Sequence, residues 1–216
     1  MDNKVERVML SLQKNNIKPY YVETKEEVVP LVNYLLNEGD TVSAGGSVSL
    51  SETGIIEHLK CGRYNFLNRN VPGLTDEDIR NIYISALNSD AYFCSCNAVT
   101  ENGELYNVDG NANRICAISF GPKSVIMIVG VNKIVCDMNE AIKRVKTIAA
   151  PKICKHRGNH TYCRKIGHCI SIDKGQIDMA SGCDSPERVC CSYLITGQQR
   201  VKDRIKIILV NDNLGF

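Results

Sequence analysis

Cysteine and histidine residues crowd into one stretch of this chain, and their side chains are the usual protein ligands of zinc and of iron–sulfur clusters. The spacings match neither the paired cysteines of zinc fingers nor the compact ferredoxin run, so they do not identify a metal. Buried thiols that pack as small hydrophobic groups, or disulfides formed in air, are the alternatives. The stretch, residues 152–192, contains Cys154, Cys163, Cys169, Cys183, Cys190 and Cys191, with His156, His160 and His168.

A glycine-containing segment, residues 42–52 (VSAGGSVSLSE), has the pattern of a short strand, a tight turn and the start of a helix. A serine and a glutamate three positions later have the spacing of a capping box. Free N–H groups at such a helix start would suit a phosphate or a carboxylate. The glycines fit neither the Walker nor the dinucleotide-binding pattern, and an ordinary capped turn is the alternative. The candidate ligand-binding residues here are Gly45, Gly46, Ser47, Ser49 and Glu52.

A second candidate site follows the strand that we predict at residues 91–95. Thr100 and Glu101 come soon after it, and open parallel sheets bind ligands outside the carboxyl ends of their strands. We therefore name Thr100 and Glu101 as candidate catalytic residues, with the glutamate as a general base or nucleophile. A polar hairpin with Asn102 and Gly103 at its turn is the alternative.

A third candidate site is the loop at residues 109–114, whose glycine and asparagines tolerate the positive φ of a tight turn. An arginine there can contact a carboxylate or phosphate through two donors. Alternatively, the loop caps a helix that starts near its end. The candidate ligand-binding residues are Gly110, Asn111, Asn113 and Arg114.

Positive charge is concentrated in residues 141–171, which contain eight Lys or Arg and no Asp or Glu, although the whole chain has a net charge of only +2. Such a region attracts an anionic small molecule, an anionic cluster or an acidic partner. Nucleic acid is disfavoured, because Tyr162 is the only aromatic residue there and single-strand binders interleave aromatic platforms with charge. A solvated helix face at residues 143–146 is the alternative.

The composition is that of a folded chain, with 216 residues of which 44% are hydrophobic and 23% charged. We expect one domain over residues 1–216, with residues 152–192 as a cysteine-rich insert or subregion. No apolar run is long enough to span a membrane, and no signal peptide is evident. We therefore expect a cytoplasmic protein without a membrane span, whose 11 cysteines are thiols or metal ligands.

Helical and strand patterns alternate along the chain, which predicts an α/β fold with a mostly parallel sheet. Apolar spacing predicts helices over residues 5–15, 26–36, 50–60, 76–87 and 138–148. Short β-prone runs predict strands over residues 41–44, 64–67, 91–95, 124–129 and 205–210. The run SVIMIV at residues 124–129 is apolar on both faces, as expected of a central strand that helices cover on either side.

The chain resembles the lactate-utilisation (LUD) domain family, and lactate-utilisation protein C in particular, in four segments: GGSVSLSETGI, AVTENGELYNVDGNANRICAISFGPKSVIMIVGVNKIV, CDSPERVC and ILVNDNLGF. FGPK, GVNKIV and LGF are near-literal matches. The resemblance implies a modified Rossmann-type sandwich like those of ribose-5-phosphate isomerase and the CoA transferases. It adds Asn132 and Lys133 to the candidate ligand-binding residues.

The resemblance also covers the cysteines. Cys163, Cys169, Cys183 and Cys190 match the four cysteines of the family's tail, although residues 170–182 form an insertion that departs from the family pattern. The implied cofactor is an iron–sulfur cluster or zinc, and there is no nucleotide fingerprint.

We therefore expect a lactate-utilisation-type protein that binds a small anionic metabolite and supports oxidation of lactate to pyruvate with iron–sulfur redox subunits. A homo-oligomer is a further expectation. A stand-alone isomerase or acyl transferase that uses Glu101, and a metabolite-binding module without catalysis, are the alternatives. The sequence leaves open whether the protein is itself an enzyme.

Overall fold

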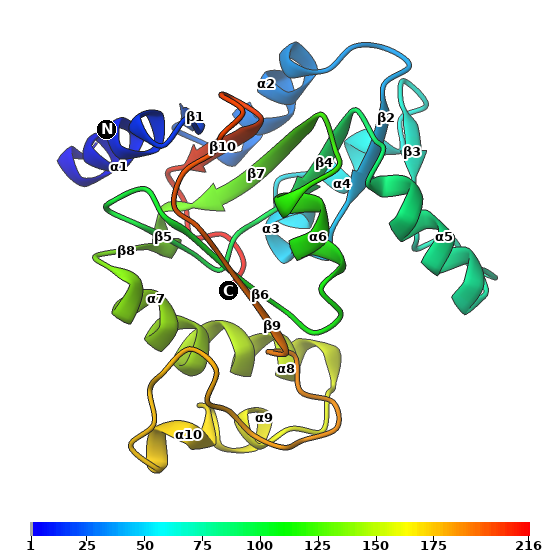
Figure 1. Ribbon diagram of the computed structural model, residues 1–216. Coiled ribbons are helices and arrows are strands. Elements are labelled where there is room, and N and C mark those ends of the chain that lie inside the picture. The colour runs from blue at the N-terminus through cyan, green and yellow to red at the C-terminus, as the bar shows by residue number, and fades with distance from the viewer. Residues whose placement is uncertain (1) are drawn as a thin grey trace.

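Six parallel strands form the larger of two sheets in the computed structural model, which describes residues 2–216 (Figure 1). The strand order is β1-β10-β7-β4-β2-β3, and every neighbouring pair is parallel. This confirms the α/β fold, and each strand that the sequence predicts is present, with β1 in addition. The strands are β1 (Lys18–Val22), β2 (Thr41–Ala44), β3 (Asn65–Leu67), β4 (Ala91–Cys94), β7 (Ser124–Gly130) and β10 (Ile205–Val210).

Helices cover both faces of this sheet, and each face has its own apolar core. One face is covered by α1 (Asn3–Lys14), α5 (Asp76–Ala86) and α6 (Asn113–Ser119), and the other by α2 (Val28–Leu35), α3 (Val48–Glu52) and α4 (Ile55–Leu59). Alternate residues of a strand point to opposite faces, so β7 gives Met127 to one core and Ile128 to the other. The central position that the SVIMIV run predicts for this strand is thereby confirmed.

The single helix predicted over residues 50–60 is wrong, because Gly54 divides it into α3 and α4. Gly54 has a φ of 71°, in the left-handed region that a continuing helix does not use. The helix predicted over residues 26–36 begins instead with a 3₁₀ turn (Lys25–Glu27), which leads into α2.

A smaller, mixed sheet lies between the parallel sheet and the cysteine-rich segment (Figure 1). Its order is β8-β5-β6-β9, with β6 antiparallel to both of its neighbours. The strands are β5 (Ala98–Thr100), β6 (Leu105–Asp109), β8 (Ile134–Val135) and β9 (Ser192–Thr196). Such short strands carry too few residues for a period of two to be recognised in the sequence.

A continuous helical run crosses this second sheet and leads into the cysteine-rich segment. It consists of α7 (Met138–Arg144), a π-helical turn (Val145–Ala149) and α8 (Ala150–Arg157). The segment that follows contains only the short helices α9 (Tyr162–Ile166) and α10 (Ile170–Asp173) before β9. Over residues 2–216, the structure contains no helix with the length and apolar character needed to cross a membrane.

Candidate functional site

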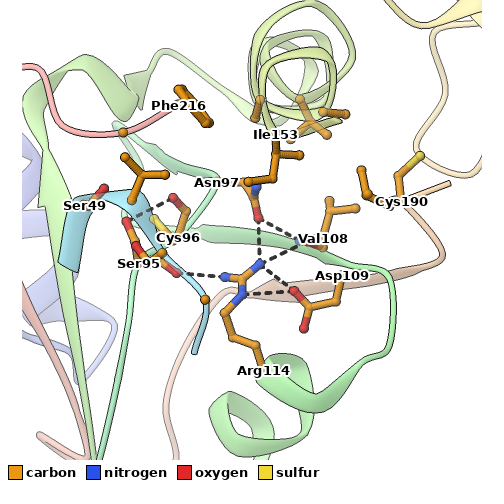
Figure 2. A pocket seen from close by; sticks show the side chains of 18 of the residues that line it. Ser49, Ser95, Cys96, Asn97, Val108, Asp109, Arg114, Ile153, Cys190 and Phe216 are labelled. Atoms are coloured by element: carbon orange, nitrogen blue, oxygen red, sulfur yellow. Dashed lines mark hydrogen bonds and ion pairs between the residues drawn. The ribbon is translucent and has the colours of Figure 1, made fainter. Parts of the chain in front are cut away.

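Loops that follow three parallel strands meet at the carboxyl edge of the larger sheet and form a cleft of about 130 Å³ (Figure 2). Ser49 follows β2, Ser95 follows β4 and Lys133 follows β7. The chain places β3 and β4 on opposite sides of β2, so the cleft lies where the strand order changes direction, the usual ligand position in open α/β sheets. The helical run from α7 to α8 closes the other side with apolar side chains such as Val145 and Ile153.

Lys133 places a positive charge on the cleft wall. Its side chain is 3% exposed, and its Nζ donates to the Oγ atoms of Ser49, at 2.8 Å, and Ser95, at 3.0 Å. No carboxylate in residues 2–216 forms an ion pair with it. Burial lowers the pKa of Lys133 to about 8. The amine therefore lacks a counter-charge, and it can gain or lose its proton within the physiological range.

Arg144 adds a second buried positive charge near the cleft. Its guanidinium donates to the backbone carbonyls of Asn97, at 2.7 Å, and Asn132, at 3.3 Å, and it is 7% exposed. Burial lowers the pKa of Arg144 as well. Carbonyl dipoles satisfy its donors without cancelling its charge, so this part of the cleft favours an anion.

Arg114 borders the cleft, and its guanidinium is held by groups of the protein itself. Its guanidinium pairs with Asp109 at 2.7 Å and donates to the Ser95 carbonyl at 2.7 Å and to Asn97 Oδ1 at 2.9 Å (Figure 2). Asp109 also accepts from the N–H of Ile115 at 2.8 Å, in the first turn of α6. The loop leads into α6, which begins at Asn113, and Arg114 ties β4 to the second sheet beside the cleft. Its contact with a ligand stays a prediction.

The cleft opens into a wider mouth of about 570 Å³ in which two further guanidinium groups meet. A Cβ atom added to Gly46 would lie 2.7 Å from Arg69 Nη2 and 3.2 Å from Arg157 Nη2. Arg69 is steadied by a hydrogen bond to Tyr83 at 2.9 Å. Adjacent guanidinium groups suit a phosphate or a second carboxylate on a bound ligand.

Gly215 and Phe216 complete the cleft wall, and two predicted ligand-binding residues hold residues 214–216 in place. Glu52 Oε2 accepts from the N–H of Gly215 at 2.7 Å, and Asn132 Oδ1 accepts from the N–H of Leu214 at 3.2 Å. The Phe216 ring faces the cleft in Figure 2.

Most of the residues predicted from the glycine segment and the third loop gather at this cleft and its mouth. The capping box is wrong, however: Ser47 is the residue that precedes α3, and the Ser49 hydroxyl accepts from Lys133 instead. α3 has only five residues, so the positive charge here comes from side chains rather than from a long helix dipole. The predicted residues that line the cleft or its mouth are Gly46, Ser47, Ser49, Gly110, Asn111, Asn113, Arg114 and Lys133, and Gly45 lies next to them against Tyr92 and Arg114.

Thr100 and Glu101 do not line the cleft or its mouth. They lie at the end of β5, in the second sheet, where the predicted hairpin is confirmed by a bond from the Gly103 N–H to the Thr100 carbonyl at 2.9 Å. Glu101 pairs with Lys4 at 3.5 Å and Arg7 at 3.4 Å on α1. Their catalytic role stays a prediction, without support from the geometry of the cleft.

The four family-matched cysteines border a separate small cavity between the α7–α8 run and the cysteine-rich segment. They are Cys163, Cys169, Cys183 and Cys190. Cys190 also borders the cleft, so the two spaces are neighbours. Within residues 2–216, no three His, Cys, Asp or Glu side chains are grouped closely enough to hold a single metal ion. All 11 cysteines are free thiols.

Cys96 lies just after β4 and borders the cleft. Its thiol is buried and donates to the Ala98 carbonyl at 3.4 Å. Burial raises the pKa of Cys96, which disfavours the reactive thiolate.

A family model for the LUD domain matches residues 5–210. The chain belongs to the LUD domain family. Among solved structures, this LUD domain is similar to a DUF162 family protein from Deinococcus radiodurans, with a TM-score of 0.53 and 17% identity over 96% of each chain. A second structure, eIF2B beta from Chaetomium thermophilum, has a TM-score of 0.36 and 15% identity over 52% of this chain and 39% of that one. No curated protein matches the sequence.

Sequence reasoning missed several residues of the cleft in this LUD domain. Ser95 ends the strand predicted at residues 91–95, and the rule that places ligands at strand ends could have found it. Arg157 lies in the basic stretch at residues 141–171. That stretch predicted an anionic ligand or partner, but not which of its residues would contact it. Arg69 lies in the loop between β3 and α5, and nothing in the local sequence indicated it.

Proposed function

We propose that this LUD domain binds a small carboxylate metabolite of the lactate and pyruvate class in the cleft, and thereby supports oxidation of lactate to pyruvate with iron–sulfur redox subunits. The observation that carries the proposal is the buried, unpaired amine of Lys133 between two serine hydroxyls. Membership of the lactate-utilisation family supports the choice of metabolite.

The chemistry of the cleft suits a carboxylate in three ways. A buried charge is costly unless it is paired, so an anion next to Lys133 supplies the counter-charge that the protein lacks. The hydroxyls of Ser49 and Ser95 each carry a proton that they can donate to a ligand oxygen. Apolar side chains of the α7–π–α8 run, such as Val145, reduce solvent contact and strengthen these bonds.

The mouth of the cleft also favours an anionic ligand. Arg69 and Arg157 present their guanidinium groups beside Gly46, so they attract anions toward the inner cleft. A ligand that carries a second anionic group on the mouth side would contact both the arginines and Lys133.

Calorimetric titration of the full chain with L-lactate and with pyruvate tests this function. We expect at least one of the two to bind, and we expect Lys133→Gln to weaken that binding by about tenfold or more, because it removes a charge-assisted contact. Lys123→Gln is the matched control, since Lys123 pairs with Asp90 on the surface next to the amino end of β7. Equal affinities of wild type and Lys133→Gln, or no binding of either acid, would contradict the proposal.

Acyl transfer is a second candidate function, and the 2.8 Å contact between Lys133 and Ser49 favours it. In such a step the neutral amine takes the proton of the Ser49 hydroxyl while the serine oxygen bonds to the acyl carbon. The bond between the acyl carbon and its alcohol or thiol group then breaks, and the protonated amine returns the proton to that leaving group. p-Nitrophenyl acetate is a simple probe: the reaction would release p-nitrophenolate and leave an acetyl group on Ser49. An unmodified protein mass after incubation would exclude this function and leave carboxylate binding intact.

A further inference from the structure

The mouth of the cleft is larger than a three-carbon acid requires. Its volume of about 570 Å³ falls within the range of pockets that hold whole organic ligands, about 300–1,000 Å³, whereas the inner cleft beside Lys133 has about 130 Å³. Gly46, Gly110 and Arg157 border both spaces, so the mouth is continuous with the cleft. The mouth can therefore hold a chemical group of its own.

Two guanidinium groups converge on one point of this mouth because the fold brings together the ends of two parallel strands. β2 and β3 are parallel neighbours, with Ser43 opposite Leu67, so Gly46 after β2 and Arg69 after β3 lie at the same edge of the sheet. Arg157, the last residue of α8, reaches the same point from the helical run that closes the cleft. A Cβ on Gly46 would lie within 3.2 Å of both Nη2 atoms.

Neither of these guanidinium groups is neutralised by the described part of the chain. Among residues 2–216, no carboxylate forms an ion pair with Arg69 or Arg157. Arg69 instead donates to the neutral hydroxyl of Tyr83 at 2.9 Å and lies over its ring, 5.4 Å from the centroid. These contacts hold Arg69 in place but leave its charge intact. Two like charges this close repel each other, and an anion between them would remove that cost.

The charge of the whole lining distinguishes a phosphate from a second carboxylate. Four arginines and two carboxylates line the mouth, which gives it a net charge of +2; they are Arg69, Arg114, Arg157, Arg188, Asp109 and Glu187. Both carboxylates already have partners, since Asp109 pairs with Arg114 and Glu187 accepts from the N–H of His160 at 2.7 Å. A phosphate monoester has a charge of about −1.5 to −2 near pH 7, whereas a carboxylate carries a single negative charge. A phosphate therefore matches the lining, and its oxygens can accept from both guanidinium groups at once.

We propose that Arg69 and Arg157 form a phosphate-binding site at the mouth, and that this site takes a phosphate monoester. The mouth has room for the organic part of such an ester beside the phosphate. Asn70, Asn111 and Asn113 line this space, and their amides both donate and accept hydrogen bonds, so they suit a polar organic group. The site goes beyond the proposed function, and binding of lactate or pyruvate at Lys133 does not depend on it.

Calorimetric titration of the full chain with methyl phosphate and with dimethyl phosphate tests the site. Above about pH 7 the first is mainly a dianion, and the second, which lacks the ionisable proton, is a monoanion. We expect methyl phosphate to bind at least about tenfold more tightly, and Arg69→Gln and Arg157→Gln each to weaken its binding by about tenfold or more. Arg63→Gln is the matched control and should bind like wild type, because Arg63 is exposed and precedes β3, whereas Arg69 follows it. No binding of methyl phosphate, equal binding of the two phosphates, or wild-type affinity in either variant at the mouth would overturn the site.

Two further ligands separate an ester from free phosphate. Glycerol 3-phosphate keeps the phosphate group and adds hydroxyl groups, whereas inorganic phosphate has no organic part. We expect the ester to bind more tightly, because its hydroxyls can also contact the amides of the mouth; equal or tighter binding of inorganic phosphate would overturn the ester. Lys133→Gln should bind glycerol 3-phosphate like wild type, so failure of the phosphate site and failure of carboxylate binding are distinguishable. A loss in that variant would place the phosphate in the inner cleft and overturn the site at the mouth.

Gly46→Ala tests the position of the phosphate without removing a charge. The added Cβ would approach Arg69 Nη2, which is the free end of a flexible side chain, so Arg69 should move aside while the fold remains. We expect severalfold weaker binding of methyl phosphate with an unchanged circular dichroism spectrum. Wild-type affinity in the folded variant would contradict a phosphate held between the two guanidinium groups.

Discussion

The buried charge of Lys133 should make the free energy of unfolding depend on pH by an amount that follows from its pKa. Its folded pKa of about 8 lies below its ordinary value of 10.5, so between these values the unfolded chain binds more protons than the folded one. Stability therefore rises with pH across that window. The full difference of about 2.5 pKa units corresponds to about 3 kcal/mol. Near pH 7, burial of the charged amine therefore lowers the stability of the folded protein by about this amount. Roughly 1 kcal/mol of this should be regained between about pH 7 and about pH 9.

Lys133→Met isolates this effect, because methionine fills similar space without a charge. We expect the variant to be more stable than wild type near pH 7, by up to about 3 kcal/mol less the value of the two lost hydrogen bonds. The advantage should shrink as pH rises. Urea denaturation of both proteins at several pH values measures this advantage. Subtracting the free energy of unfolding of wild type from that of the variant at each pH removes the contribution of other titrating groups. A difference that stays constant from about pH 7 to about pH 9, or a variant that is less stable throughout, would refute the reasoning.

Three further changes test the surroundings of the cleft. Gly130→Ala should lower the free energy of unfolding by about 2 kcal/mol, because a Cβ there would lie 2.6 Å from backbone atoms of Asp212 and Leu214. Gly197 has open space around it, so Gly197→Ala should change the free energy of unfolding little in the same urea titration. Asp109→Ala should cost about 3 kcal/mol by leaving the buried guanidinium of Arg114 without its partner, and a loss below 1 kcal/mol by thermal or urea denaturation would argue against that arrangement. Glu101→Gln should change stability by less than about 1 kcal/mol and leave ligand affinity unchanged in calorimetry, whereas a large loss of turnover or affinity would restore Glu101 as a site residue.

The sequence predicted the parallel sheet well because the strong signals belong to its buried strands. The run SVIMIV of β7 is apolar at every position except its first residue, and β10 has a similar pattern. The second sheet was missed because its strands have two to five residues, and their pairing depends on contacts between distant segments. β6, for example, pairs with β9 across the whole cysteine-rich segment.

The site was predicted only in part, because local patterns indicate the ends of the parallel strands but not the contacts between distant segments. The strand–turn–helix pattern placed Ser49 at the cleft because β2 belongs to the parallel sheet, whereas Glu101 lies away from the cleft because β5 belongs to the other sheet. Family resemblance contributed Lys133, but only the structure shows that its amine lies between two hydroxyls. The partner of Arg114 also depends on tertiary contacts, since Asp109 and the Ser95 carbonyl reach it from different strands.

Proton uptake on ligand binding tests the central claim, a carboxylate bound next to Lys133, most directly. Calorimetric titration with pyruvate or L-lactate at about pH 8.5, in two buffers of different ionisation enthalpy, measures the protons taken up per ligand. A carboxylate beside the amine raises its pKa, so the account predicts uptake of about 0.7 proton by wild type and none by Lys133→Met. Binding of equal strength without proton uptake, or uptake that persists in the variant, would contradict it.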